Sequence, residues 1–344
     1  MKKISLILFT FLLIFSQVFS QVSDKNKKNA KTAYNSAVEN IRMLNFESAL
    51  TYLDAAVELD PGLNDALIQR AKVKVELGRI NDAINDFNIA GSIDPKNGEP
   101  DFYLGYLPFA ADTAGIVIDR LNSAILKGYK QPQAYYYRGL YYLLASNYSE
   151  ALNDFTAAVD LKENYSLAYH DRAAAKRALG DLQGALYDYR LATNFDNNFP
   201  LAFNNMGSVK MVLGDYDGAL ADFSVAINLK PDFYIAYNNR GTAKYYLGQA
   251  DSALVDFDKA ISLQQDFLPA INNKAAGLTK KEAYSEAIGL LDQVVASDNH
   301  FAKAYLNRGL VRELTGDLEG ACKDWKMALE LGVNEAEKYI KECK

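Results

Sequence analysis

The stretch YNNRGTAKYYLG, residues 237–248, decides the fold because close variants of it recur along the chain. YYYRGLYYLLAS occupies residues 135–146, and YLNRGLVRELTG occupies residues 305–316. Each copy contains an Arg-Gly pair and ends at a small residue that is typical of a turn. Copies of one fragment at regular intervals indicate a protein built from internal repeats.

A column of small residues sets the length of the repeat at 34 residues, with no insertion between copies. The column consists of Ala37, Ala71, Gly105, Gly139, Ala173, Gly207, Gly241, Ala275 and Gly309. Two columns made almost entirely of alanine and one column of large apolar residues keep the same phase. This spacing predicts two amphipathic helices in each repeat, with a turn between them.

The 34-residue pattern resembles the tetratricopeptide repeat. The resemblance covers nine repeats over residues 30–335, which start near residues 30, 64, 98, 132, 166, 200, 234, 268 and 302. It implies an all-α fold, a right-handed α-α superhelix (solenoid) of about nine helical hairpins. It also implies that the first helix of each repeat lines a concave groove. One helical pair cannot bury its apolar face alone, so stacked neighbours share a core.

The N-terminal segment MKKISLILFTFLLIFSQVFSQ has the features of a secretory signal peptide. Two lysines precede an apolar run that is shorter than the ~20 residues that a bilayer-spanning helix needs. We therefore expect residues 1–20 to be a signal peptide and residues 21–29 to be a flexible leader. The expected location is the bacterial envelope, either periplasmic or extracellular, with no transmembrane segment after signal cleavage. The alternative is an uncleaved membrane anchor.

Composition and motifs exclude several functional classes. The chain has 37 basic and 43 acidic residues, a net charge of −6, and no basic patch, which argues against a nucleic-acid partner. It has no glycine-rich phosphate loop, metal-spaced His/Cys set or nucleophile motif, so we expect no enzyme, no cofactor and no metal. The two histidines, His170 and His300, lie in unrelated repeats, and we expect His170 to be a solvated side chain, the alternative being a ligand contact in the groove.

The arginine of the opening fragment has an aspartate sixteen residues later in five repeats. These five candidate pairs are Arg70 and Asp86, Arg138 and Asp154, Arg172 and Asp188, Arg240 and Asp256, and Arg308 and Asp324. A guanidinium fork matches a carboxylate geometrically. We predict structural ion pairs between the two helices, within one repeat or across a junction. The alternative is a row of arginines that binds an anion.

Asparagines recur one residue before the arginine column. They are Asn35, Asn205, Asn239, Asn273 and Asn307. In the tetratricopeptide family this position points into the groove, and the row is similar to the asparagine ladder of the repeat domain in O-linked N-acetylglucosamine transferase, which grips a peptide backbone. An amide side chain offers a donor and an acceptor to one peptide group. We predict peptide binding there, the alternative being that these asparagines only solvate the groove.

Repeats 3 and 4 contain an aromatic cluster. We expect five of its members to face the groove, namely Phe102, Tyr103, Tyr106, Tyr136 and Tyr137. Aromatic residues are common binding hot spots, and their rings also stack on sugars. The alternative is that they fill the core around an irregular third repeat.

Two cysteines lie near the C-terminus. Cys322 and Cys343 are placed almost symmetrically about Gly332, so a helical hairpin that turns there brings them level. Because an exported protein meets oxidising conditions, we predict a disulfide that pins a capping helix, whose C-terminal part is residues 336–344. Two independent thiols are the alternative. This C-terminal segment resembles the ends of secreted repeat proteins from Gram-negative envelopes.

These features together predict a non-catalytic protein–protein interaction scaffold that binds an extended peptide or partner protein in its concave groove. The alternative function is a carbohydrate- or cell-wall-binding module that uses the tyrosine cluster of repeats 3 and 4. The sequence leaves the partner and the oligomeric state open.

Overall fold

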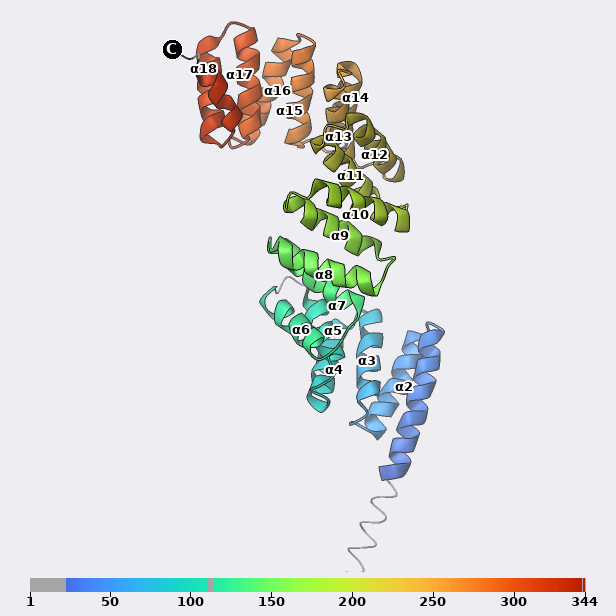
Figure 1. The fold of residues 1–344 in the computed structure, drawn as a ribbon. Helices are drawn as coiled ribbons and strands as arrows, with labels where there is room; N and C mark the ends of the chain where they lie inside the picture. The colour runs from blue at the N-terminus through green and yellow to red at the C-terminus, as the bar shows by residue number, and fades with distance from the viewer. Residues whose placement is uncertain (1–22, 110–113, 342, 344) are drawn as a thin grey trace, which may run out of the picture. The chain divides into compact units, whose positions relative to one another are not determined.

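The structure, a computed structural model, describes residues 23–109, 114–341 and 343. Residues 1–20, which we expect to be a signal peptide, lie outside the described residues. Regular secondary structure over the described ranges is entirely helical, which confirms the predicted all-α class. The chain divides into two compact units, Met1–Glu163 and Asn164–Lys344, and each is a stack of helical pairs (Figure 1).

The N-terminal unit consists of consecutive helices that pack on one another in order. It contains a helix over residues 23–42, followed by α2 (Phe46–Leu59), α3 (Asn64–Glu76), α4 (Ile80–Ile93), α5 (Glu99–Phe109), α6 (Ala114–Leu126), α7 (Pro132–Leu144) and α8 (Tyr148–Leu161). The first helix begins at residue 23, so the prediction that residues 21–29 form a flexible leader is wrong for residues 23–29. Extending a helix that packing already anchors costs little, because each added residue gains one backbone hydrogen bond.

The C-terminal unit repeats the same arrangement. It contains α9 (Ser166–Ala178), α10 (Leu182–Phe195), α11 (Pro200–Val212), α12 (Tyr216–Leu229), α13 (Tyr234–Tyr246), α14 (Ala250–Leu263), α15 (Leu268–Lys280), α16 (Tyr284–Ser297), α17 (Ala302–Leu314), α18 (Leu318–Glu330), the 3-10 helix η1 (Asn334–Ala336) and α19 (Glu337–Ile340). In addition to the packing of consecutive helices, the first helices α11, α13, α15 and α17 contact one another in order. None of the described helices is long and apolar enough to cross a membrane.

Helix starts follow the 34-residue period. The second helices α10, α12 and α14 begin at Leu182, Tyr216 and Ala250. The turn before α14 contains Gly248 at φ 78°, a left-handed conformation that glycine adopts without a steric penalty. Local turn chemistry and hydrophobic periodicity therefore agree on where each helix stops.

The core of each repeat is a large side chain of the second helix packed against a small residue of the first. Phe257 on α14 is 1% exposed and lies against Gly241 on α13. A Cβ atom at Gly241 would come within 2.7 Å of the Phe257 ring. The small-residue column thus exists because the two helices approach each other closely at this point.

All five candidate Arg–Asp pairs form within their own repeats, each through two hydrogen bonds from Nε and Nη2. Several of the arginines also reach the second helix of the preceding repeat. Arg308 Nη1, for example, donates to Asp292 Oδ1 at 2.7 Å, and Arg70 Nη1 donates to Asp54 Oδ1 at 3.0 Å. The arginine therefore ties three helices together.

A second cation column, which the sequence analysis overlooked, lies four residues after the arginine. Its members contact the same buried aspartates and are Lys74, Lys176, Lys210, Lys244 and Arg312. Two of the repeats that carry the aspartate have only one of its two cations. Tyr142 replaces the second cation in repeat 4, and Met206 replaces the arginine in repeat 6. Accordingly, burial raises the pKa of both Asp154 and Asp222 above its ordinary value.

The third repeat reverses the polarity of this ion pair. Asp101, on the first helix α5, is 4% exposed and accepts hydrogen bonds from Arg120 and Ser123 of the second helix α6 and from Lys127 in the turn that follows it. The cation and the carboxylate have exchanged helices, but the interhelical contact is retained.

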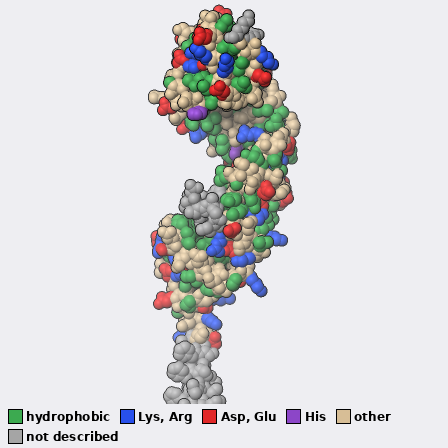
Figure 2. Space-filling view, turned by 90° about the vertical axis from the view of Figure 1, so that its left-hand side faces the viewer, with side chains coloured by type: hydrophobic (Ala, Val, Ile, Leu, Met, Phe, Trp, Pro, Cys, Tyr) green, Lys and Arg blue, Asp and Glu red, His purple; other side chains and the backbone are tan. Residues whose placement is uncertain are grey.

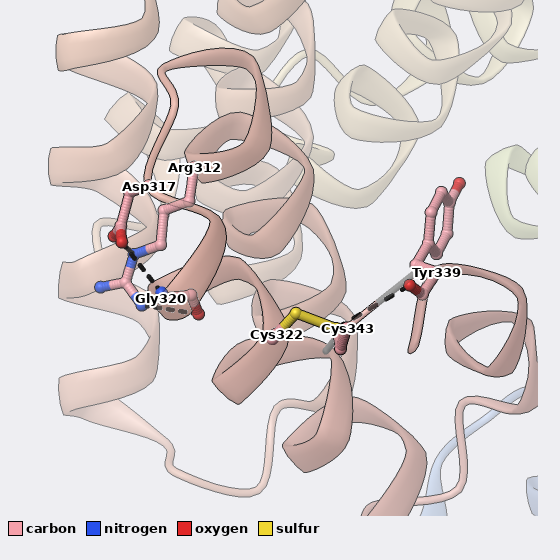
Figure 3. Close-up of a disulfide and its surroundings, with 6 residues drawn as sticks. All are labelled: Arg312, Asp317, Gly320, Cys322, Tyr339 and Cys343. Carbon is pink, nitrogen blue, oxygen red and sulfur yellow. Dashed lines mark hydrogen bonds and ion pairs between the residues drawn. A yellow bond between two sulfur atoms is a disulfide. The ribbon is translucent and has the colours of Figure 1, made fainter. Parts of the chain in front are cut away.

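The C-terminal end of the last repeat is covered by a short segment, which we call the cap (residues 333–341). A disulfide joins Cys322 on α18 to Cys343, with the two Cα atoms 5.8 Å apart (Figure 3). Tyr339 of the cap stacks on Trp325 at a centroid distance of 5.1 Å. The cap is a 3-10 turn followed by the four-residue helix α19, so the expected capping helix is present over Glu337–Ile340. Pairing Tyr339 with Trp325 and burying Ala336 covers the last repeat without a longer helix.

Candidate functional site

The first helices of the C-terminal unit carry seven asparagines whose side chains form one hydrogen-bonded chain, which we call the amide row. Its members are Asn204 and Asn205 on α11, Asn238 and Asn239 on α13, Asn272 and Asn273 on α15, and Asn307 on α17. Two kinds of hydrogen bond alternate along it. Asn239 Nδ2 donates to Asn204 Oδ1 of the preceding repeat at 3.0 Å, and Asn238 Nδ2 donates to Asn239 Oδ1 within its repeat at 3.3 Å.

The same alternation continues to the end of the unit. Asn273 donates to Asn238 at 2.9 Å, Asn272 donates to Asn273 at 3.2 Å, and Asn307 donates to Asn272 at 2.9 Å. Followed from Asn307, each amide donates to the next member of the hydrogen-bonded chain, as far as Asn205. The row therefore has a single polarity.

The row ends at a histidine on α9. Asn205 Nδ2 lies 3.0 Å from His170 Nε2, and His170 Nδ1 lies 2.8 Å from Asp171 Oδ1. The His170 ring packs on Phe199 at a centroid distance of 4.9 Å and is 7% exposed. The expectation that His170 is a solvated side chain is therefore wrong, because neighbouring helices close over the ring.

Burial separates the two asparagine columns of the row. Asn204, Asn238 and Asn272 are buried, with 3–7% of each residue exposed, whereas Asn205, Asn239, Asn273 and Asn307 are half-buried. The buried column was not among the candidate site residues, although its spacing of 34 residues was visible in the sequence. Its role follows only from the packing, which places each buried amide between two half-buried ones.

Asn35 does not join the amide row. It is exposed on the helix over residues 23–42, in the N-terminal unit, whereas all members of the row belong to the C-terminal unit. The corresponding positions in the four repeats between them carry Gln69, Tyr103, Tyr137 and Asp171, so no run of amides leads from Asn35 to Asn205.

Five members of the amide row line a groove of about 600 Å³ over α13, α15 and α17, namely Asn238, Asn239, Asn272, Asn273 and Asn307. Leu306, Leu310 and Ala276 add apolar surface beside the amides, and Val333 of the cap also lines the groove. Two charged side chains of opposite sign, Lys303 and Glu335, complete the lining. The groove therefore combines amides and apolar side chains with little net charge.

The amides retain hydrogen-bonding capacity toward this groove. An amide side chain has two N–H donors and two acceptor lone pairs. Among the described residues, Asn239 uses one N–H on Asn204 and one lone pair on Asn238, which leaves one donor and one acceptor without a protein partner. Asn307 keeps its Oδ1 unused in the same sense, because Leu306 stands where the other repeats have the buried asparagine.

The arginines do not form an anion site. Their Nε and Nη2 atoms are spent on the buried aspartates of the same repeat, as at Arg240 and Asp256. On the face drawn in Figure 2, basic and acidic side chains are interspersed rather than gathered by sign. Within the described residues no group of three or more His, Cys, Asp or Glu side chains is placed to hold a metal ion.

The aromatic cluster of repeats 3 and 4 is mostly core. Phe102 and Tyr136 are only 5% and 7% exposed, so little of either ring is open to a ligand. Phe102 packs against Tyr129 and Tyr106 at centroid distances of 5.0 and 5.9 Å. These two residues occupy the same repeat position as the buried asparagines, and this position faces neighbouring helices in both units.

The other three aromatic residues are half-buried. Tyr103 stacks on Phe87 at 4.6 Å and lies under Lys72, while Tyr106 and Tyr137 pack on each other at 4.6 Å. Ring faces already used in these contacts are less available to a ligand than isolated exposed rings. The irregular third repeat thus uses its aromatic residues chiefly to fill space.

Comparison with known proteins identifies one repeat directly. Residues 234–267 match the family model described as tetratricopeptide repeat. A human protein, tetratricopeptide repeat protein 13, is 29% identical over 133 residues, which is 39% of this chain. The matched region spans 15% of that protein's length.

Solved structures share the fold at low sequence identity. The hetero-tetramer Cut9–Hcn1 of the APC/C has a TM-score of 0.60 at 16% identity, covering 91% of this chain and 75% of that chain. The Pseudomonas aeruginosa protein pilF has a TM-score of 0.53 at 20% identity, covering 61% of this chain and 97% of that chain. Residues 234–267 are thus a tetratricopeptide repeat, and the chain has the fold of a tetratricopeptide-repeat solenoid.

Proposed function

We propose that this protein is a non-catalytic interaction scaffold that binds an extended peptide, or an extended segment of a partner protein, in the groove over α13, α15 and α17. The observation that carries the proposal is the amide row along that groove. Within the part of the chain that the structure describes, half-buried Asn239 keeps an unpaired donor and an unpaired acceptor, and Asn307 keeps an unpaired acceptor. A peptide group supplies the complementary acceptor and donor.

The surroundings of the row favour backbone recognition over recognition of charge. The lining contains one lysine and one glutamate, so it has little attraction for a strongly charged ligand. Leu306 and Leu310 offer apolar contacts beside the amides. A chain without regular secondary structure leaves its own peptide groups unpaired, and each new hydrogen bond contributes about 0.5–1.5 kcal/mol. Several such hydrogen bonds together supply useful affinity that depends little on the amino-acid sequence of the bound peptide.

The carbohydrate alternative has less support. Two of its five aromatic residues, Phe102 and Tyr136, are buried. The remaining rings already pack on protein neighbours.

We also propose that the protein is exported. The disulfide between Cys322 and Cys343 supports this proposal, since disulfides persist mainly in oxidising compartments. Mass spectrometry of protein secreted from a bacterial host would locate the N-terminus of the mature chain and test the proposed cleavage before Gln21.

The peptide proposal is tested by selecting ligands from a library of random unstructured peptides and measuring their affinities by calorimetry. Asn239→Ala combined with Asn273→Ala should weaken binding about tenfold or more, because the groove loses the donor and acceptor that Asn239 offers and the acceptor that Asn273 offers, the N–H groups of Asn273 being held by Asn238 and Thr242. The matched control is Asn228→Ala, an exposed asparagine on α12. Equal affinities for the double variant, the control and the wild type would contradict the proposal, provided circular dichroism shows all three to be folded.

A parallel glycan array tests the alternative. Tyr103→Ala with Tyr137→Ala should leave peptide binding in the C-terminal unit unchanged, because both residues belong to the N-terminal unit. Glycan binding that this pair of substitutions abolishes would favour the carbohydrate module instead.

A further inference from the structure

The amide row ends on two groups whose chemistry fixes its polarity. Asp171 Oδ1 lies 2.8 Å from His170 Nδ1, and an ionised carboxylate can only accept a hydrogen bond. His170 Nδ1 must therefore carry the proton. At the other side of the ring, Asn205 Nδ2 lies 3.0 Å from His170 Nε2, and an amide nitrogen can only donate. His170 Nε2 must therefore be an unprotonated acceptor.

The orientation set at His170 propagates along the whole row. With its Nδ2 turned to His170, Asn205 presents Oδ1 to Asn204, which must donate to it at 3.2 Å. Asn204 then presents its own Oδ1 to Asn239, and the pattern continues to Asn307. Reversing one amide would set two donors or two acceptors against each other. In a buried position that mismatch is costly, so the row is oriented as a unit.

Among the groups packed around His170, Asp171 decides which ring nitrogen carries the proton. Tyr189 on α10 is fully buried and lies edge-on to the ring at 5.5 Å, and burial raises its pKa to about 12, so it remains neutral at physiological pH. Phe199 covers the ring at 4.9 Å, and Asn205 comes from α11. Of these ring contacts, only Asp171 is charged. A neighbouring carboxylate on one ring nitrogen is the usual means by which a histidine tautomer is selected.

We infer that His170 and Asp171 are positioning residues that give the amide row one orientation, so that the groove accepts an extended peptide in one chain direction only. The inference rests on the proposed peptide-binding function. Along the row each half-buried asparagine turns Nδ2 toward the preceding repeat, or toward His170 in the case of Asn205. Because the two heteroatoms lie on opposite sides of an amide, Oδ1 is then the atom nearer the cap. Asn239 can pair with both polar groups of one extended residue, in which case its Oδ1 takes the N–H and its Nδ2 takes the C=O.

This order sets the direction of the peptide. Within one residue the N–H precedes the C=O along the chain. The N–H lies toward the cap and the C=O lies toward His170, so the peptide runs from the cap toward α11. Its amino end is near α17 and its carboxyl end is near α11, which is antiparallel to the order of the repeats.

The chain offers a built-in reporter of direction. Its single tryptophan, Trp325, lies in the last repeat and packs on Tyr339 of the cap. Neighbouring helices lie about 8–10 Å apart, so the first helices α11 to α17 span roughly 30 Å, the length of about nine extended residues. The probe is an uncharged nine-residue peptide of alternating threonine and alanine, blocked at both ends, with a fluorescent acceptor on the first or the last residue.

Energy transfer from Trp325 should be several-fold stronger to the acceptor on the first residue than to that on the last. Equal transfer to both would contradict a unique direction while leaving groove binding intact, and stronger transfer to the last residue would show the opposite direction. Binding of neither peptide would contradict the proposed function and the direction with it. Nitrogen chemical shifts of the His170 ring provide an independent test in every case.

These shifts should show the tautomer protonated at Nδ1, with exposed His300 as the reference resonance in the same spectrum. Protonation at Nε2 would overturn the assignment of polarity whatever the peptide does. Asp171→Asn replaces a carboxylate, which can only accept a hydrogen bond, by an amide, which can also donate one. We therefore expect a mixture of His170 tautomers and a smaller difference in energy transfer between the two labelled peptides. Asp217→Asn, at an exposed position on α12, is the matched control and should change neither reading. An unaltered His170 spectrum in Asp171→Asn would refute the anchoring role.

Discussion

Arg240 on α13 holds Asp256 on α14 through two hydrogen bonds, from Nε at 2.8 Å and from Nη2 at 2.7 Å. Lys244 adds a third contact at 2.7 Å to a carboxylate that is 2% exposed as a residue. The arginine of the opening sequence motif is therefore part of the framework. It fixes the pairing of α13, which carries asparagines of the amide row, with α14.

Asp256→Ala should lower the free energy of unfolding by about 3–5 kcal/mol, because it leaves two poorly exposed cations without their partner. Urea denaturation followed by circular dichroism measures the change. Asp258→Ala is the matched control on the same helix: its carboxylate is 57% exposed and pairs with Lys274, so its loss should cost less than about 1 kcal/mol. An Asp256→Ala midpoint equal to that of the control would remove the structural role of the pair.

Repeat 6 should depend on pH in the opposite sense to an ordinary ion pair. Burial raises the pKa of Asp222 above its ordinary value of 3.8, while Lys210 lowers it less. A raised pKa in the folded state gives stability that is complete below the unfolded pKa and is lost as pH rises through the folded one. Asn mimics the protonated acid at every pH.

Asp222→Asn should therefore match the wild type in acid and become the more stable protein as pH rises to neutrality. Thermal unfolding across that range measures the difference. Asp256→Asn provides the contrast, because removing a carboxylate held by two cations should destabilise the protein at neutral pH. A gain that shrinks with rising pH would show that Lys210 outweighs burial at Asp222.

Close approach of the paired helices should make Gly241 intolerant of branched side chains. Gly241→Val forces atoms against the Phe257 ring and the Ala253 carbonyl, and should cost about 1–3 kcal/mol or more. Gly289→Val, in open space on α16, should change stability by less than about 0.5 kcal/mol. Guanidinium unfolding of both variants checks the contrast, and equal effects would mean that α13 and α14 are farther apart than described.

The disulfide should stabilise the cap. Replacing Cys322 and Cys343 by serine should lower stability by roughly 3 kcal/mol for a loop of this size. A reducing agent should lower the melting temperature of the wild type and leave the double variant unchanged. Alkylation of both thiols in protein that has not been reduced would show that the bond does not form.

Local sequence patterns were sufficient to predict helices, turns and the cysteine pair. The glycine and alanine columns were informative because their size limits how closely two helices pack. The second cation column, with Lys244 as an example, was also present as a 34-residue periodicity and could have been found by counting. This column shows that Asp256 has two cationic partners, Arg240 and Lys244, whereas Asp222 has one, Lys210.

By itself the sequence determined the period and the helical pairs and indicated which arginines and aspartates pair, because these depend on spacing along the chain. The structure places each of the five pairs within one repeat. Only the tertiary structure decided that Phe102 and Tyr136 are buried, that Asn35 stands apart, and that alternating buried and half-buried asparagines join into one row ending at His170. Those outcomes depend on the distance between first helices of neighbouring repeats. Packing sets that distance, and no residue spacing encodes it.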